Sequence, residues 1–324
     1  MSCPHPVSRR SLLARFRESP TAVGTTCCIV AALGYGGVNV CLRALTVRCD
    51  RGLILFAKEA MAFACVAMWL ALRRRRDDKF VPGWRTVAGL TVVGVLTQMA
   101  ATLPFLWAMA VVGLAIAVTL SLGCSLVSSA VLGRIFLGER VSGQSLLAIG
   151  LLIGAVGFLT FGAEGGAAAV SAIEEHGRWS VLLATAVACL AGTIYGLLNV
   201  SIRGSVTGGV SPGFVAVIIP VTGVICLAPT YVGRLVLGNA PTFSGTDILV
   251  LLIAGSMNVV AWFAFIQGLK TTRVVHANVL TASQVAMAAI AGVVFFEESA
   301  SPALLTGVAM TIAGMVSIDR PSTG

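Results

Sequence analysis

A polar motif occurs twice in this chain, and its two copies lie 160 residues apart. Each copy places a tyrosine, an asparagine and an arginine at intervals of four residues, so in a helix the three side chains line one face. The copies are Tyr35, Asn39 and Arg43, and Tyr195, Asn199 and Arg203. Phenols and carboxamides bind polar solutes by hydrogen bonds, whereas an asparagine can equally bond to a neighbouring helix. We interpret the tyrosines and asparagines as candidate binding residues, and the arginines as anchors at the ends of their helices.

Lys58 and Glu59 are unusual because they interrupt an otherwise apolar segment. A charged side chain near the centre of a membrane helix costs about 2.5–3.5 kcal/mol on insertion scales. Since adjacent residues point about 100° apart on a helix, we do not expect these two to neutralise each other. We therefore predict a functional role for both. The alternative is a structural ion pair, for example between Glu59 and Arg43.

Further polar residues fall at matching places in the two halves of the chain. Gln98 and Asn258 are separated by the same 160 residues, and Trp262 lies one turn beyond Asn258. A later segment carries Ser121, Ser125 and Ser128, and its counterpart carries Asn278 and Gln284. We interpret the serines as packing residues, because small hydroxyl side chains allow helices to approach closely. The remaining members of this set join the candidate binding residues: Gln98, Asn258, Trp262, Asn278 and Gln284.

The composition indicates that all of these residues lie in a membrane protein. Hydrophobic residues make up 57% of the 324 positions, charged residues 11%, and the mean hydropathy is +0.95. A soluble chain of this length needs far more charge on its surface. Since about 20 apolar residues span a bilayer as a helix, we predict an all-α integral membrane protein with ten transmembrane helices. The predicted spans are residues 21–42, 52–72, 86–107, 113–133, 143–162, 180–202, 212–232, 247–267, 274–296 and 303–318.

The basic residues predict the orientation of the chain. With the N-terminus in the cytoplasm, sixteen of the 22 lysines and arginines fall in inward-facing segments, as the positive-inside rule requires. We therefore predict a multi-pass protein of the cell (inner) membrane with both termini in the cytoplasm. The net charge of +9 follows from this topology, so no nucleic-acid partner is expected. The nine cysteines fall mostly within predicted spans without metal-ligand spacing, and we predict neither a metal nor a cofactor.

The duplication divides the chain into two units of five spans each. Because five is odd, the second unit must enter the membrane from the opposite face, which makes the repeat inverted. We predict a basic cytoplasmic segment at residues 1–20, a first repeat at 21–162, an external loop at 163–179, a second repeat at 180–318 and a cytoplasmic tail at 319–324. Bundles of this kind often bind a solute where their halves meet.

Two acidic motifs carry a resemblance to a known family. They are Phe136-Leu137-Gly138-Glu139-Arg140 and Phe295-Phe296-Glu297-Glu298, each leading into a glycine-containing span. In these motifs the chain resembles the drug/metabolite transporter superfamily, in its ten-helix group with two EamA-type repeats. We interpret Glu139 and Glu298 as structural ties at the N-terminal ends of the fifth and tenth helices, where a carboxylate complements the helix dipole. The family's prolines in the fourth and ninth helices are replaced here by Gly123-Cys124 and Ala282-Ser283.

The resemblance implies a secondary transporter that moves a small organic metabolite, as an exporter or an exchanger, by alternating access. The first, third, fourth, sixth, eighth and ninth helices would line the route, while the fifth and tenth would brace the bundle or form a homodimer contact. The sequence lacks the G-x-x-x-x-G-K-[ST] loop of ATP-driven proteins, so a coupling ion such as a proton, or a counter-solute, would drive transport. Hydrolase motifs are also lacking, and we predict no enzyme. A non-transporting membrane scaffold or sensor is the alternative.

Overall fold

The computed structural model describes residues 20–46, 51–73, 82–112, 114–139, 141–161, 177–236, 243–284, 286 and 302–317. All regular structure within these residues is helical, which confirms the all-α prediction for this part of the chain. The helices are α2 (Pro20–Thr46), α3 (Arg51–Arg73), α4 (Trp84–Leu96), the π-helical segment η1 (Thr97–Thr102), α5 (Leu103–Val112), α6 (Leu114–Leu137), α7 (Gly143–Phe161), α9 (Arg178–Thr207), α10 (Pro212–Val236), α11 (Gly245–Thr271), α12 (Val274–Ala282) and α14 (Pro302–Val316).

Seven of the described helical stretches are long and apolar enough to cross a membrane. They are Ala22–Leu42, Gly52–Trp69, Trp84–Ala108, Leu120–Leu137, Arg178–Thr207, Pro212–Gly233 and Gly245–Thr271. The predicted fifth and tenth spans contain shorter apolar helices, Gly143–Ala155 and Leu305–Gly314. Large apolar side chains such as Leu72 and Ile135 are exposed, as helices that face lipid require. The membrane character of the chain is therefore clear, whereas ten crossings in two inverted repeats stay a prediction.

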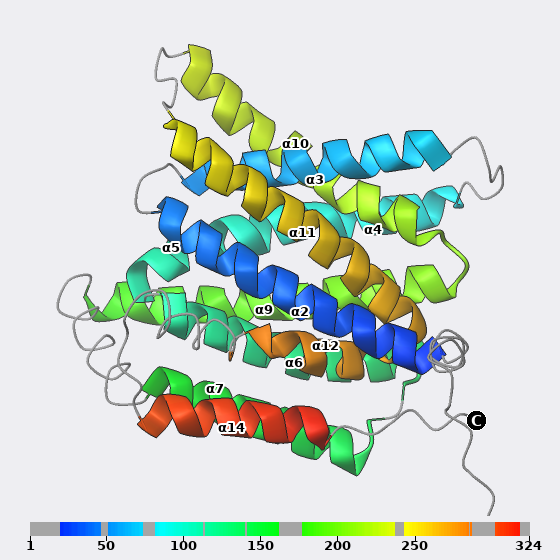
Figure 1. Ribbon diagram of the computed structural model, residues 1–324, viewed down its shortest axis with the longest axis vertical. Coiled ribbons are helices and arrows are strands. Elements are labelled where there is room, and N and C mark those ends of the chain that lie inside the picture. Colours follow the sequence, from blue (N-terminus) through cyan, green and yellow to red (C-terminus); the bar gives the residue numbers. More distant parts are fainter. Residues whose placement is uncertain are drawn as a thin grey trace, which may run out of the picture.

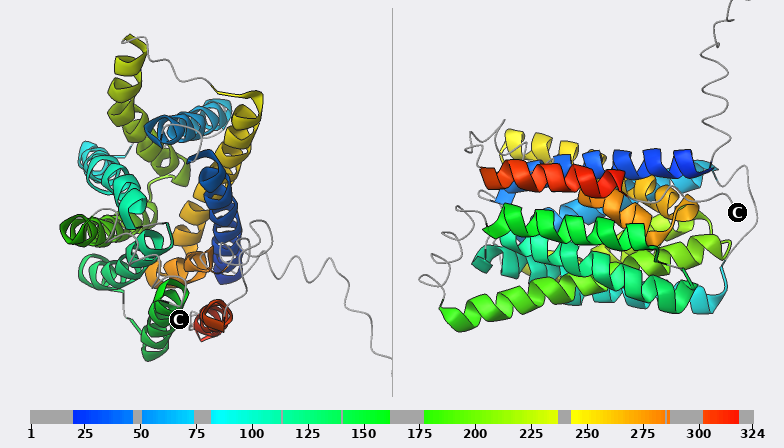
Figure 2. Two further views of the ribbon diagram at one scale, coloured as in Figure 1. Left: turned by 90° about the vertical axis from the view of Figure 1, so that its left-hand side faces the viewer. Right: turned by 90° about the horizontal axis from the view of Figure 1, so that it is seen from below.

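The two halves of the chain interleave instead of folding side by side. Helix α2 from the first half packs along α11 from the second, and α9 from the second half packs along α6 and α5. Figure 2 shows the helices along and across the bundle, with their axes broadly aligned. Helices α7 and α14 pack against each other at the lower edge of Figure 1. Polar residues far apart in sequence therefore meet between the halves.

Small residues allow the interleaved helices to approach closely. A Cβ atom added to Gly34 of α2 would lie 2.7 Å from the Cβ of Ala261 on α11. A Cβ atom on Gly192 of α9 would collide with the backbone carbonyl of Ser121 on α6. Because larger side chains would push these pairs apart, glycine sets the distance between the two halves.

The predicted third span, residues 86–107, is not one uniform α-helix. It consists of α4, the π-helical turn η1 and α5, and the backbone N–H of Leu103 bonds to the carbonyl of Gln98 five residues earlier. Pro104 follows directly, and a proline within a helix clashes with the carbonyl four residues before it. A π turn relieves such a clash by adding a residue to the turn. At the two places where the family's prolines are replaced, the helices differ. Helix α6 continues through Gly123-Cys124, whereas α12 ends at Ala282.

Candidate solute-binding cavity

A cavity of about 340 Å³ lies between the two halves of the bundle. Its walls come from α2, α3, the α4–η1–α5 span, α6, α9, α10, α11 and α12. Of the candidate binding residues predicted above, ten line this cavity: Tyr35, Lys58, Glu59, Gln98, Tyr195, Asn199, Asn258, Trp262, Asn278 and Gln284. The side chain of Asn39 lies outside what the structure describes. The expected packing serines Ser121 and Ser125 also line it, together with Thr97, Thr102 and Thr281.

Two matching pairs of aromatic rings form part of the cavity wall. Tyr35 of α2 meets Phe265 of α11 edge to face, with ring centroids 6.3 Å apart. Tyr195 of α9 meets Phe105 of α5 in the same manner, again at 6.3 Å. Each pair joins the first helix of one half to the third helix of the other, so the four rings surround the cavity from both halves.

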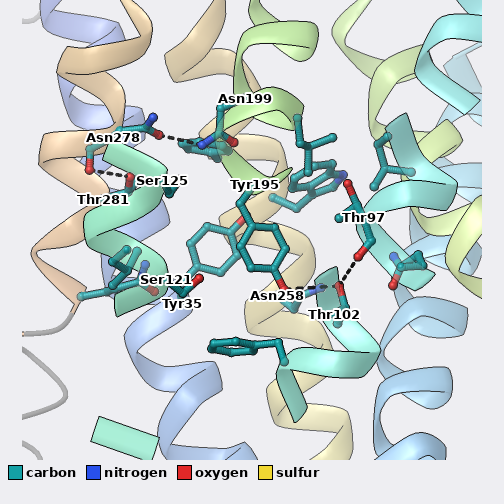
Figure 3. A pocket seen from close by; sticks show the side chains of 18 of the residues that line it. Tyr35, Thr97, Thr102, Ser121, Ser125, Tyr195, Asn199, Asn258, Asn278 and Thr281 are labelled. Atoms are coloured by element: carbon teal, nitrogen blue, oxygen red, sulfur yellow. Dashed lines mark hydrogen bonds between the residues drawn. The ribbon is translucent and has the colours of Figure 1, made fainter. Parts of the chain in front are cut away.

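Polar contacts hold the two sides of α9 to different neighbours, as Figure 3 shows. On one side, the Asn199 carboxamide donates to the Oδ1 atom of Asn278 on α12 over 2.9 Å. On the other side, the Tyr195 hydroxyl donates to the Thr102 hydroxyl of η1 over 3.3 Å, and Thr102 donates to the Thr97 carbonyl. Asn199 therefore bonds to a neighbouring helix, which was the alternative to a role in solute binding, and it lines the cavity at the same time.

Lys58 and Glu59 form an ion pair, contrary to our expectation that they would not neutralise each other. The Lys58 Nζ atom lies 3.2 Å from Glu59 Oε1. The two Cβ atoms point about 100° apart, but the lysine side chain is long enough for its ammonium group to reach the neighbouring carboxylate. Our expectation considered the Cβ directions and not this length. Glu59 also packs closely against the backbone of α10, since a Cβ on Gly223 would lie 2.8 Å from Glu59 Cγ. They are the only charged side chains among the described lining residues.

Helix α10 contributes Ile219 and Pro220 to the wall, although the predicted route left this helix out. Pro220 has no backbone N–H, so the carbonyl of Ala216 lacks its usual helical donor. The indole Nε1–H of Trp262 donates to that carbonyl over 3.2 Å. The proline inside an apolar span was the available sequence signal, because it leaves a carbonyl that must find another donor.

Glu139 and Arg203 have partners that the sequence did not predict. Glu139 accepts from the backbone N–H of Val274, so it caps α12 and not α7, the helix that directly follows it. Arg203 pairs with Glu139 at 3.1 Å and donates to the carbonyls of Leu269 and Lys270 at the end of α11. This Glu139–Arg203 clamp joins α9 to the α11–α12 turn, so Arg203 is more than an interfacial anchor. Glu298 lies outside the described residues.

No group of three or more metal-ligating side chains occurs within the described residues. The described lining instead combines one internally paired lysine and glutamate with phenols, carboxamides, hydroxyls and aromatic rings. These side chains offer hydrogen-bond donors, acceptors and ring faces, which are the groups that pockets for small molecules use.

Comparisons with known proteins bear on the second half and on the fold. The model of the EamA-like transporter family matches residues 182–318. No curated protein matches the chain significantly. One solved structure, named only "Crystal structure of protein", superposes with a TM-score of 0.70 at 15% sequence identity, over 91% of this chain and 95% of that chain. This likeness shows a shared fold.

Proposed function

We propose that this chain is a secondary transporter, because residues 182–318 match the model of the EamA-like transporter family. It carries a small organic solute across the cell (inner) membrane by alternating access. The observation that carries the proposal is the cavity between the two halves, which is lined with polar side chains from both. A static scaffold has no need of such a lining, because uncompensated polar groups within a membrane are costly.

The paired aromatic contacts support an inverted repeat of the two halves. Exchanging the halves turns the Tyr35–Phe265 pair into the Tyr195–Phe105 pair, and both have the same centroid distance and edge-to-face type. Inverted repeats allow the two ends of a route to open in turn, because each half can adopt the conformation of the other. Residues 21–162 and 180–318 are the two units in this proposal.

The Glu139–Arg203 clamp lies at the end of the bundle that we predict to face the cytoplasm. It holds α9 against the α11–α12 turn. We propose that it closes the cytoplasmic end of the route in this conformation and separates when that end opens.

Both termini are cytoplasmic in the proposed topology. Transport is coupled to a proton or to a counter-solute, and α7 with α14 is the proposed homodimer contact; no catalytic step is involved.

A flux measurement distinguishes a transporter from a non-transporting scaffold or sensor. Purified protein in liposomes is supplied with a panel of small organic solutes, with and without a pH gradient. Asn258→Leu removes a carboxamide that lines the cavity at similar side-chain volume, so we expect the solute flux to fall at least tenfold. The matched control Thr193→Val lies on the exposed face of α9 and is expected to retain flux. Absence of flux across the whole panel for the unmodified protein argues against the proposal.

A further inference from the structure

Two buried polar atoms of the cavity wall lack a hydrogen-bond partner. They are the Oε1 atom of Gln98 and the Nδ2 atom of Asn278. The two residues are only 3% and 6% exposed, and both line the cavity. Folded proteins rarely leave buried polar atoms unpaired, and such atoms call for an explanation. Because both residues line the cavity, a rotation of either carboxamide brings its unpaired atom to a solute, which then donates to Gln98 or accepts from Asn278.

The walls around these atoms suit a flat molecule. Gln98 belongs to η1 and Asn278 to α12, and Figure 3 shows Thr97 of η1 and Asn278 on opposite sides of the Tyr35 and Tyr195 rings. Trp262 adds a further ring to the same cavity, held in place by its bond to Ala216. Aromatic side chains stack on the flat face of a planar ring, and this contact does not depend on which polar groups the ring carries at its edge.

The charge of the described lining limits the solute further. Lys58 and Glu59 are paired at 3.2 Å, so their charges cancel within the cavity wall. An anionic or cationic solute would enter a membrane-embedded cavity without an unpaired counter-charge, which is unfavourable where the dielectric is low. A solute with no net charge leaves the ion pair intact.

We propose that the cavity binds an uncharged planar heterocycle with hydrogen-bond donors and acceptors around its rim. This is the chemistry of purine and pyrimidine bases and of their nucleosides. The cavity volume of about 340 Å³ lies at the low end of the roughly 300–1,000 Å³ typical of ligand pockets, as a solute of this size requires. The inference rests on the proposed transport function and names the solute class for the same cavity.

The experiment measures binding to the purified full-length protein in lipid nanodiscs by calorimetry. The probes are hypoxanthine, inosine, inosine monophosphate and tryptophan, which represent a free base, a nucleoside, an anion and a zwitterion. We expect hypoxanthine or inosine to bind at least tenfold more tightly than the monophosphate and tryptophan. The difference between the first two probes shows whether the ribose contributes to recognition.

Variants at Gln98 separate ligand recognition from a structural role. Gln98→Leu removes the unpaired acceptor, so we expect the affinity for the neutral probe to fall at least tenfold while the Tm of the empty protein rises. A glutamine that only supports the fold would show the opposite pattern, with a lower Tm and unchanged affinity. The matched control is Gln267→Leu, an exposed position on α11, for which we expect unchanged affinity.

Three outcomes overturn the inference, and they are distinguishable from failure of the transport function. Binding of the monophosphate as tight as that of inosine contradicts the role of the neutral lining. Binding of tryptophan in preference to the neutral probes contradicts the inference as well. It would mean that Lys58 and Glu59 separate and pair with the charged groups of the solute. Absence of binding by both neutral probes, while other solutes cross the liposome membrane, refutes the solute class and leaves the transport function standing.

Discussion

Tyr195 and Asn199 belong to one stripe of α9, yet each is tied to a different helix. Tyr195 bonds to Thr102 of η1, whereas Asn199 bonds to Asn278 of α12. Both side chains also line the cavity, so they join helices and contribute polar groups to the cavity wall. Residues with both tasks affect stability and function together when they are replaced.

Asn199→Ala tests this dual task. The change removes the donor to Asn278 and leaves a second polar atom of Asn278 unpaired. We expect a loss of about 0.6–1.7 kcal/mol in the free energy of unfolding, the range for interhelical hydrogen bonds in membranes. Solute flux should fall by about tenfold, since one lost solute hydrogen bond is worth about 1.4 kcal/mol. Thermal denaturation and liposome flux measure the two effects.

Thr193→Ala is the control on the same helix, because Thr193 is exposed and its hydroxyl donates to the Cys189 carbonyl one turn earlier on the same helix. It should leave both quantities nearly unchanged. Wild-type flux in Asn199→Ala would remove Asn199 from the proposed route.

At the scale of the helix, two prolines disturb the regular pattern next to the cavity. Pro104 follows the π turn η1, and Pro220 leaves the Ala216 carbonyl to Trp262. These irregular turns place Gln98, Thr102 and Trp262 against the cavity. Helical periodicity alone does not predict such turns, because it assumes 3.6 residues in every turn.

Pro220→Ala and Trp262→Phe test the link between the proline and the indole. Trp262→Phe leaves the Ala216 carbonyl without its donor, and we expect a loss of about 1–3 kcal/mol in stability. Adding Pro220→Ala restores a backbone N–H, so the double variant should regain part of that loss. Thermal denaturation of both single variants and the double variant gives the coupling. Simple additivity of the two effects would show that Trp262 does not stabilise the turn through Ala216.

The Glu139–Arg203 clamp also acts between elements. It binds the end of α11 through Arg203 and the start of α12 through Glu139. The geometry needs a branched cation, since the guanidinium contacts a carboxylate and two carbonyls at once.

Arg203→Lys therefore keeps the charge but loses the branched geometry. We expect a loss of about 1.5–3 kcal/mol in stability for Arg203→Ala, typical of hydrogen bonds to charged groups, and an intermediate loss for Arg203→Lys. Denaturant titration in detergent provides the comparison, with Arg178→Ala at the exposed start of α9 as the control. Equal stability of Arg203→Lys and the unmodified protein would mean that charge alone suffices.

At the scale of the whole molecule, the orientation in the membrane is the main prediction to test. Helix α9 runs from Arg178 to Thr207, and our topology places its start outside and its end in the cytoplasm. In intact cells an impermeant maleimide should label Arg178→Cys but not Thr207→Cys, in a background whose native cysteines are replaced. Membrane permeabilisation should then expose the second position. The reverse labelling pattern would invert the topology.

Much of the site could be predicted from the sequence because the two halves repeat. The offset of 160 residues identified Tyr35 with Tyr195 and Gln98 with Asn258, and all four line one cavity. Their polarity within apolar spans was the signal, since hydrocarbon offers no hydrogen-bond partner. Ile219 was missed because an apolar side chain carries no such signal. Pro220 was missed because its signal is the unpaired carbonyl that it leaves on Ala216, and not a polar side chain.

The sequence by itself determined the class of the protein: long apolar runs require helices in lipid, and the repeated polar positions mark helices that line the cavity. Only the tertiary structure decided the partners. Lys58 pairs with its neighbour Glu59, Glu139 accepts from the first backbone N–H of α12, and the indole of Trp262 donates to the Ala216 carbonyl. The physical reason is the distance along the chain over which each effect operates. Hydropathy and periodicity are properties of neighbouring residues, whereas side-chain pairing depends on which helices of the two interleaved halves touch.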